Sequence, residues 1–275
     1  MPRLLCFGIG YTARAFVEQL GPGWSVIGTT RRGDGDGEDH AFARDHPLPR
    51  AAFAGVTHIL VSIPPDERGD PVLDAHAGDI STLKTLRWLG YLSTTGVYGT
   101  RDGGWVDETA ELKPTGPRSR RRVAAERAWR ALGAPAHVFR LAGIYGPGRS
   151  VFDTLRAGTA KRIDKPGHVF SRIHVDDIGR VLLASLAKPQ PGAVYNVCDD
   201  EPAAQAAVVA HAATLLGMAP PPLTPFAEAA LSPMARSFWA DNKRVSNALV
   251  KCELGVEFAY PSYREGLAAI LAAGG

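Results

Sequence analysis

Apolar runs and amphipathic segments alternate along the first half of the chain. The runs 4–7, 24–30 and 57–63 predict strands, and the almost continuously apolar character of 57–63 is typical of a parallel strand covered on both faces. Between these runs, 13–20 and 71–88 have the composition of helices. The alternation predicts an α/β fold with a doubly wound parallel sheet.

The same pattern continues past the middle of the chain. Residues 88–99 and 136–146 predict strands, with a helix over 118–132 between them. Residues 173–188 predict a further strand and helix, and 193–197 a last strand. We therefore expect a sheet of the Rossmann type.

The second half of the chain is less regular. After residue 201 it is mostly helical and interrupted by prolines, as expected of a small cap over the carboxyl edge of the sheet. We therefore assign 1–148 and 173–198 to the α/β core. Residues 149–172 and 199–275 are assigned to a C-terminal cap lobe.

A glycine turn separates the first predicted strand from the first predicted helix. In its Gly-x-Gly-x-x-Ala pattern, Gly8 permits the turn, Gly10 lets backbone amides approach a pyrophosphate, and Ala13 permits close helix packing. Tyr11 and Thr12 lie within the same turn. The strand–turn–helix context favours a dinucleotide site over a merely structural turn.

The end of the second predicted strand bears on which dinucleotide binds. Arg31 and Arg32 follow Thr30 there. An arginine at this place pairs with the 2′-phosphate of NADP, whereas a carboxylate binds the ribose hydroxyl of NAD. We predict NADP in preference to NAD. Two alternatives stay open: the arginines could be solvated, and a shift of the loop could bring in Asp34 or Asp36.

Several further segments carry a family resemblance. They are STTGVYG (93–99), WVDE (105–108), RLAGIYGPGR (140–149), IHVDDI (173–178), VYNVCDDEP (194–202) and YREGL (263–267). With the glycine turn, the chain resembles the extended short-chain dehydrogenases/reductases, the NAD(P)-dependent epimerase/dehydratase-like proteins, over nearly its whole length. The resemblance implies a Rossmann core, a C-terminal substrate lobe, and a catalytic Ser/Thr, Tyr and Lys beside the nicotinamide. We also predict cofactor contacts at Ser62, Ile63, Pro64 and Gly143.

By position, the Ser/Thr of that family corresponds to Thr94, four residues before Tyr98. The Thr94 hydroxyl could hydrogen-bond a substrate oxygen. Nucleotide-sugar 4,6-dehydratases place an acidic pair directly after this residue, but Thr95 and Gly96 stand here. The sequence therefore disfavours that subclass.

The Tyr-x-x-x-Lys pair of the family is absent. Counting back from Glu126, Arg122 stands in the Lys position and Arg118 in the Tyr position, and no tyrosine has a lysine four residues on. Arg122 could still hold the cofactor ribose and stabilise negative charge. Arg118 stays protonated near neutral pH, so it cannot exchange a proton as the tyrosine does.

Other side chains could supply the missing proton. The candidates are Tyr98, Asp107, Glu108, Tyr145 and His168. Each also has an ordinary alternative role, because the aromatic rings could pack in the core and the carboxylates could be solvated in loops.

Arginines are also the candidates for substrate binding. Arg118 and Arg122 share one helical face and could bind a phosphate or carboxylate together with Arg149 or Arg172. A solvated basic helix face is an equally good interpretation. Arg120 and Arg121 point elsewhere on the helix, so the basic run does not form the single stripe expected of a nucleic-acid site.

Composition narrows the remaining possibilities. With 275 residues, 45% hydrophobic residues and a net charge of +3, the chain is an ordinary globular protein without a nucleic-acid or membrane signature. Cys6, Cys198 and Cys252 have no metal or disulfide spacing, and we expect free thiols, no export signal and a cytoplasmic location. We predict no metal, because His174 belongs to a segment in which Asp176 or Asp177 would cap a helix.

Two functional hypotheses follow. The first is an atypical NADP-dependent oxidoreductase or epimerase-like enzyme for a small anionic or sugar-like substrate, with non-standard catalytic residues. The second is a non-catalytic NADP(H)-binding sensor or regulatory protein. The helices predicted around 75–86 and 118–132 could form a homodimer interface.

Overall fold

The computed structural model describes residues 1–33 and 39–274. Within them, seven strands form one parallel sheet: β1 (Arg3–Phe7), β2 (Ser25–Thr30), β3 (His40–Ala41), β4 (His58–Val61), β5 (Trp88–Thr94), β7 (Ala136–Leu141) and β11 (Val194–Val197). Their order across the sheet is β11-β7-β5-β4-β1-β2-β3. The predicted doubly wound Rossmann-type sheet is thereby confirmed.

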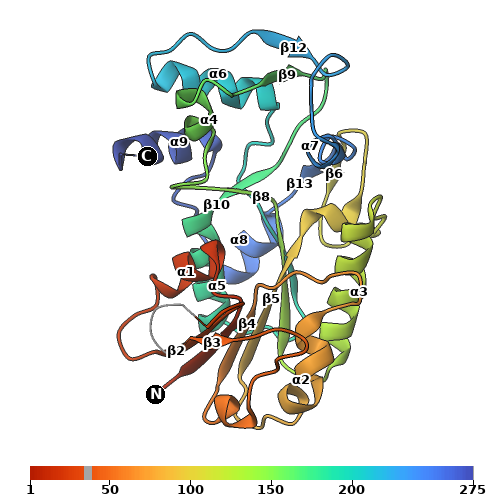
Figure 1. Ribbon diagram of the computed structural model, residues 1–275, viewed down its shortest axis with the longest axis vertical. Coiled ribbons are helices and arrows are strands. Elements are labelled where there is room, and N and C mark those ends of the chain that lie inside the picture. The colour runs from red at the N-terminus through yellow and green to blue at the C-terminus, as the bar shows by residue number, and fades with distance from the viewer. Residues whose placement is uncertain (34–38, 275) are drawn as a thin grey trace.

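Helices cover both faces of this sheet (Figure 1). One face packs against α1 (Tyr11–Val17), α5 (Val175–Ala187) and α8 (Ala248–Leu254), and the other against α2 (Pro71–Ser81) and α3 (Pro117–Ala131). Alternate residues of β1 serve the two faces: Leu4 and Cys6 join the first apolar core, and Leu5 and Phe7 the second. A strand buried on both sides accounts for the continuous apolar runs in the sequence.

A smaller lobe stands over the carboxyl edge of the sheet (Figure 1). Its helices α4 (Val151–Arg156), α6 (Gln205–Leu215) and α9 (Tyr263–Ala272) share a separate apolar cluster. Its strands β9 (Arg162–Asp164) and β12 (Leu223–Pro225) pair with each other, and the short α7 (Pro233–Ser237) follows.

Two short strand pairs connect the core with the lobe. β8 (Gly143–Tyr145) pairs with β10 (Arg172–His174), and β6 (Trp105–Val106) pairs with β13 (Arg244–Val245). Both pairs are parallel and join segments far apart in the chain. They bring residues around 170 and 244 to the carboxyl edge of the main sheet.

Several predicted boundaries differ from the structure. The helix expected over 71–88 ends at Ser81, and Trp88 begins β5 instead. The strand expected over 136–146 is interrupted at Ala142, between β7 and β8. The strand expected over 88–99 ends at Thr94, because the Thr94 hydroxyl accepts a hydrogen bond from Gly96 N and starts a 3-10 turn. Asp34 and Asp36 lie outside the described residues.

The predicted cap of α5 is wrong. His174 caps this helix, with its Nδ1 accepting from Asp176 N at 3.2 Å. Asp177 is fully buried and accepts instead from the backbone N–H groups of Ala259 and Tyr260 at 2.8 and 3.0 Å. The carboxylate therefore fastens the chain that leads into α9.

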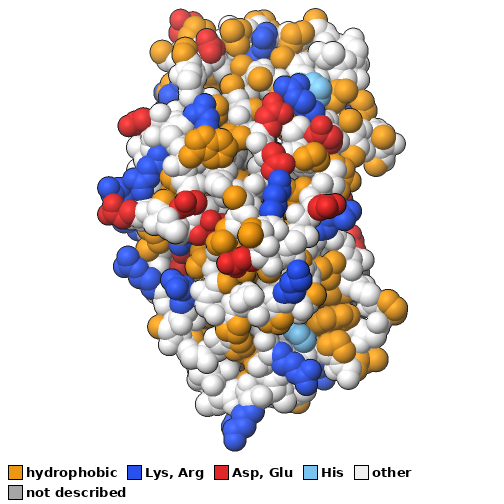
Figure 2. All heavy atoms as spheres, turned by 180° about the vertical axis from the view of Figure 1, so that it is seen from behind, with side chains coloured by type: hydrophobic (Ala, Val, Ile, Leu, Met, Phe, Trp, Pro, Cys, Tyr) orange, Lys and Arg blue, Asp and Glu red, His pale blue; other side chains and the backbone are white. Residues whose placement is uncertain are grey.

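Cys6 and Cys198 are buried free thiols, and Cys252 is an exposed one. In the described part of the chain, no helix is both long and apolar enough to cross a bilayer. Figure 2 shows one face of the molecule, where cationic and anionic side chains are interspersed rather than gathered into one basic patch.

Candidate active site

A cavity of about 1110 Å³ lies between the carboxyl edge of the sheet and the lobe. The predicted site residues that line it are Thr12, Ser62, Pro64, Thr94, Arg118, Arg122, Gly143, Arg149 and Arg172. Small-molecule pockets usually occupy roughly 300–1,000 Å³. The cavity is therefore large enough for the end of an extended cofactor and a small substrate together.

The two glycines of the turn have different structural roles. Gly8 has a φ of +87°, and a Cβ built on it would lie 2.8 Å from Ile63 Cγ1. Its N–H donates to Thr29 Oγ1 at 2.8 Å, which ties the turn to β2. A Cβ on Gly10 would meet nothing within 4 Å. The fold therefore needs glycine at position 8, whereas the space beside Gly10 is free for a ligand.

The residues after Gly10 pack against the lobe side of the cleft. Ala13 is buried, as close helix packing requires. The Tyr11 hydroxyl donates to Pro147 O at 3.0 Å, and the Arg149 guanidinium lies 5.8 Å from the centre of the Tyr11 ring. Arg149, predicted as a substrate residue, is therefore placed beside the glycine turn.

The end of β2 exposes Arg31 and Arg32. The Thr30 hydroxyl accepts from Gly33 N at 2.8 Å and thereby shapes the turn that carries them. A carboxylate that the sequence analysis missed also lies here, because a Cβ on Gly28 would overlap Asp39 Oδ1. Nothing in the local pattern around Asp39 indicates this approach.

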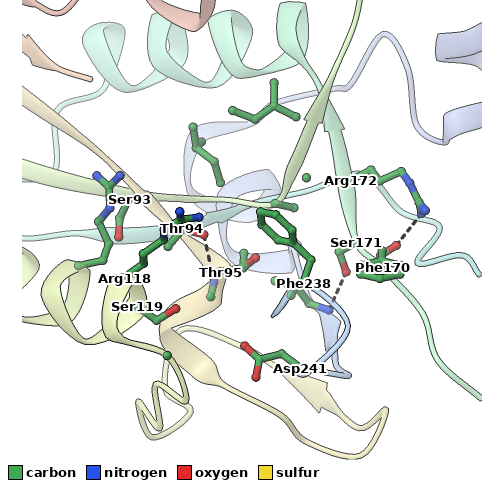
Figure 3. A pocket seen from close by; sticks show the side chains of 18 of the residues that line it. Ser93, Thr94, Thr95, Arg118, Ser119, Phe170, Ser171, Arg172, Phe238 and Asp241 are labelled. Atoms are coloured by element: carbon green, nitrogen blue, oxygen red, sulfur yellow. Dashed lines mark hydrogen bonds between the residues drawn. The ribbon is translucent and has the colours of Figure 1, made fainter. Parts of the chain in front are cut away.

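Thr94 and Arg122 are held at the end of β5. The Thr94 hydroxyl accepts from Gly96 N at 3.1 Å, which leaves its hydrogen available to a ligand. Arg122 Nη1 donates to Leu92 O at 2.7 Å and to the Tyr91 hydroxyl at 3.1 Å. In Figure 3, Arg118 and Ser119 lie beside Thr94 on one side of the cavity.

Tyr98 is not among the described residues that line the cavity. It is completely buried, and its hydroxyl donates to Asn196 Oδ1 at 2.7 Å and accepts from Arg140 Nη1 at 2.8 Å. Burial raises the pKa of Tyr98 to about 12. These contacts place it in the core.

Three other candidates for proton transfer also make hydrogen bonds within the protein. Asp107 is exposed and accepts from Thr109 N and Oγ1, whereas the Glu108 carboxylate accepts from Asn196 N at 2.7 Å. Tyr145 does line the cavity, but its hydroxyl donates to Ser262 O at 3.2 Å and burial raises its pKa.

His168 is buried behind the cavity wall. Its ring lies 4.7 Å from that of Phe170 and 5.2 Å from that of Trp239. Burial, aided by the nearby Lys165 charge, lowers the pKa of His168 to about 4. The imidazole is therefore neutral near pH 7.

Arg172 enters the cavity from the lobe side. Its Nη1 donates to Phe170 O at 2.8 Å and to Ala203 O at 3.0 Å, and burial lowers its pKa. Behind it, Asp199 is 1% exposed, and neither carboxylate oxygen has a hydrogen-bond partner among the described residues. Burial raises the pKa of Asp199 to about 8, despite the opposing charge of Arg172.

Part of the cavity wall was missed by sequence reasoning. The additional lining residues include Phe170, Ser171, Phe238, Trp239, Asp241 and Lys243. Figure 3 shows Phe238 and Asp241 between the Thr94 side and the Arg172 side. These residues follow irregular or proline-rich segments, which have no periodicity that would have indicated a site.

The charge of the wall is strongly one-sided. Among the described lining residues, the cationic side chains are Arg118, Arg121, Arg122, Arg149, Arg172 and Lys243, and the only carboxylate is that of Asp241. A partly enclosed cavity with this lining attracts anions. No cluster of three or more metal-ligating His, Cys, Asp or Glu side chains occurs in the described residues.

The fold and the cleft place this chain in a known structural class. The structure of dTDP-glucose 4,6-dehydratase from Bacillus anthracis str. Ames, in complex with NAD, has a TM-score of 0.80 with 18% identity, covering 99% of this chain and 96% of that one. The human epimerase family protein SDR39U1 with NADPH has a TM-score of 0.76 with 17% identity, covering 98% and 99%. The fold is that of the extended short-chain dehydrogenase/reductase proteins.

A more similar structure is that of a functionally unknown conserved protein from Silicibacter pomeroyi DSS. It has 52% identity and a TM-score of 0.94, with 99% of both chains covered, and the present chain belongs to the same family. The curated protein YeeZ of Escherichia coli K12 is 24% identical, over 95% of this chain and 97% of its own. No protein-family model matches the sequence.

Proposed function

We propose that this protein is an NADP(H)-dependent oxidoreductase or epimerase-like enzyme that acts on a small anionic or sugar-like substrate. The observation that carries the proposal is the cavity between core and lobe, lined by six cationic side chains and one carboxylate. A phosphate or carboxylate group would find charge-assisted hydrogen bonds there. The partial enclosure of the cavity strengthens those interactions, because charges near a protein interior are screened less than in bulk water.

The glycine turn supports the dinucleotide part of the proposal. The open space beside Gly10 leaves room for a pyrophosphate, and Ser62, Pro64 and Gly143 lead from that turn along the cavity wall. The dehydratase and SDR39U1 structures, which share the fold, are described as complexes with NAD and NADPH. When bound, a nicotinamide supplies a hydride donor or acceptor.

Arg31 and Arg32 support NADP over NAD. Both side chains are exposed at the end of β2, where they are free to turn toward a 2′-phosphate. Asp39 approaches Gly28, two residues before the end of β2. A carboxylate at this place would accept a hydrogen bond from the ribose hydroxyl of NAD. Asp39 therefore favours NAD, whereas Arg31 and Arg32 favour NADP.

The residues at the end of the cavity proposed for the nicotinamide could stabilise negative charge on a substrate. Thr94 would donate a hydrogen bond to a substrate oxygen, and Arg118 would place a fixed positive charge beside it. Arg122 is fastened to β5 and would hold negative charge or the cofactor ribose. Neither Arg118 nor Arg122 acts as an acid or base in this proposal, because guanidinium groups keep their protons near neutral pH.

Calorimetric titration of the full chain with NADPH and NADH tests the cofactor. Saturable binding with NADPH tighter than NADH is expected, and no binding of either would overturn the proposal. A second step screens phosphorylated and carboxylated carbonyl compounds for NADPH oxidation. An active compound should lose turnover with Thr94→Ala, while NADPH affinity stays the same.

A non-catalytic NADP(H) sensor is the second candidate. It is favoured by the burial of Tyr98 and by arginines where the resembling family has its Tyr and Lys. A sensor would bind NADPH tightly, turn over no compound in the screen and show no dependence on Thr94. The screen therefore separates the two candidates.

The remaining assignments are proposals as well. We assign the core to 1–148 and 173–198, the substrate lobe to 149–172 and 199–275, and a possible homodimer interface to α2 and α3. The free thiols are consistent with a cytoplasmic location. Sedimentation of the purified chain would test dimer formation.

A further inference from the structure

The segment 241–245 crosses the cavity with an alternating pattern. Asp241, Lys243 and Val245 line the cavity. Asn242 and Arg244 make their contacts elsewhere, with the loops around residues 100–104 and 167. An extended backbone directs successive side chains to opposite sides, so the segment presents every second residue to the cavity.

The segment is fixed on its outer side. Asn242 O accepts from Arg101 N at 2.8 Å and from Gly103 N at 3.1 Å, and Asn242 Oδ1 accepts from Val169 N at 3.1 Å. Arg244 N donates to Gly104 O at 2.9 Å. These bonds come from both the core and the lobe, and they hold Lys243 at a defined place in the wall.

Lys243 is an unusual lysine for its surroundings. Its side chain is 10% exposed, and its nearest carboxylate oxygen, Asp241 Oδ2, lies 3.8 Å from Nζ. Asp241 is itself fixed, because its Oδ1 accepts from Thr115 Oγ1 at 2.7 Å. The ammonium thus has a charge partner beside it but lies beyond hydrogen-bonding distance.

Burial disfavours the protonated form of Lys243, the Asp241 carboxylate favours it, and the remaining charged groups nearby in the described part of the chain add no further carboxylate. Arg101, on the loop outside the segment, adds a like charge, and His168 behind the wall is neutral near pH 7. Arg118, Arg121 and the other lining arginines add further positive charge to the cavity. Burial, more than any of these charges, lowers the pKa of Lys243.

We propose that Lys243 is the proton-exchanging residue of this cavity, a role that rests on the proposed function. In a carbonyl reduction, a bound reduced nicotinamide dinucleotide would supply the hydride for the carbonyl carbon. The C=O π electrons move to oxygen, which takes a proton from the Lys243 ammonium. An alcohol, the oxidised dinucleotide and a neutral lysine result, and the lysine regains its proton from water.

The alternatives in the cavity fit this role less well. The lining arginines keep their protons, and Tyr145 donates its hydroxyl hydrogen to a backbone carbonyl. Tyr98 lies in the core, and His168 lies behind Phe170 and Trp239. The Lys243 amine can release a proton, and the neighbouring Asp241 carboxylate favours its return to the protonated form.

The first test does not depend on turnover. Competitive acetylation of the full chain at a series of pH values, with peptide mass spectrometry, follows the titration of individual lysines. Lys243 should become reactive at lower pH than Lys113, whose side chain is 57% exposed. Titration of Lys243 together with Lys113 or above it would overturn the assignment, whatever activity the enzyme has.

The second test compares three variants on a compound that the wild type reduces. Lys243→Met and Lys243→Arg should each lower kcat by about 100-fold to 10,000-fold, with NADPH affinity and thermal unfolding unchanged. Lys113→Met is the control and should keep wild-type kcat. Activity retained in Lys243→Arg would make position 243 a mere anion holder and refute proton exchange.

The two proposals fail in distinguishable ways. NADPH binding without turnover of any compound by the wild type would overturn the enzymatic function, and the role of Lys243 with it. Turnover that survives Lys243→Met would overturn the role of Lys243 alone.

Discussion

The guanidinium of Arg140 and the carboxylate of Glu126 form an ion pair of 2.8 Å, with side chains only 5% and 3% exposed. Glu126 also accepts from the Ser93 hydroxyl, and Arg140 donates to the Tyr98 hydroxyl. The network begins at Ser93 in the cavity wall and ends in the core. It accounts for the burial of a glutamate on α3.

Substitution of one partner should show how much this ion pair contributes to the free energy of unfolding. Glu126→Gln would leave the Arg140 charge buried without compensation, so the free energy of unfolding should fall by about 3–5 kcal/mol. Urea unfolding followed by circular dichroism measures it. Glu67→Gln is the matched control, because it breaks only the exposed pair with Arg121 and should cost about 0–1 kcal/mol. Equal losses in both variants would contradict the assigned role of the buried pair.

The two glycines of the turn should respond differently to substitution. Gly10→Val should keep the wild-type melting temperature but lose NADPH binding, because its new side chain enters free space needed by the pyrophosphate. Gly8→Val should unfold at lower temperature, since position 8 has a φ of +87° and a Cβ there meets Ile63. Thermal melting and calorimetry on both variants check this. NADPH affinity retained in Gly10→Val would refute the cofactor site.

Cofactor preference should depend on Arg31. Arg31→Ala should weaken NADPH binding about tenfold or more and leave NADH nearly unchanged, because a charge-assisted bond to the 2′-phosphate is worth about 1.5–3 kcal/mol. Asp39→Asn should instead favour NADPH relative to NADH, by removing a like charge near that phosphate. Parallel calorimetric titrations measure both ratios. Equal losses of the two cofactors in Arg31→Ala would remove that residue from the site.

Substitutions of Thr94 and Tyr98 should have different effects, the first on turnover and the second on stability. Thr94→Ala should lower turnover by about 100-fold or more, because it removes a hydrogen bond to the developing negative charge. Tyr98→Phe should leave turnover unchanged and lower stability by about 1–3 kcal/mol, because Asn196 and Arg140 lose a buried partner. Steady-state kinetics and urea unfolding on each variant distinguish the effects. A turnover loss confined to Tyr98→Phe would reverse these assignments.

Stability should depend on pH through Asp199. Burial raises its pKa in the folded protein to about 8, whereas an unfolded Asp titrates near 4. Below about pH 4 both states hold the proton and the contribution is fully present. It is lost as the pH rises toward 8, because the unfolded state releases a proton that the folded state keeps.

Asp199→Asn tests that sign. Asn resembles the protonated carboxyl, so the variant should lose less stability than the wild type between about pH 5 and about pH 8. Urea unfolding at several pH values in that window measures the slope. A steeper slope in the variant would show that Asp199 is ionised in the folded protein.

The sequence alone was sufficient for the core and for the glycine turn. Strand and helix periodicity is local, and a strand covered on both faces leaves a continuous apolar run, as in 57–63. The turn from Gly8 to Ala13 could be recognised because its conformational demands fall on consecutive residues. Thr94, Arg118 and Arg122 were assigned through the family resemblance. They lie at the end of β5 and in the first turns of α3.

Only the tertiary structure determined which residues form the cavity wall opposite Thr94 and which titratable groups are buried. Lys243, Trp239 and Phe170 line the same cavity because β13 pairs with β6 and β10 with β8, across long stretches of chain. The sequence left both a catalytic and a core role open for Tyr98, because the pattern around it carries no sign of its partners Asn196 and Arg140. Burial, hydrogen bonding and pKa depend on neighbours far away in sequence, and local periodicity does not encode those neighbours.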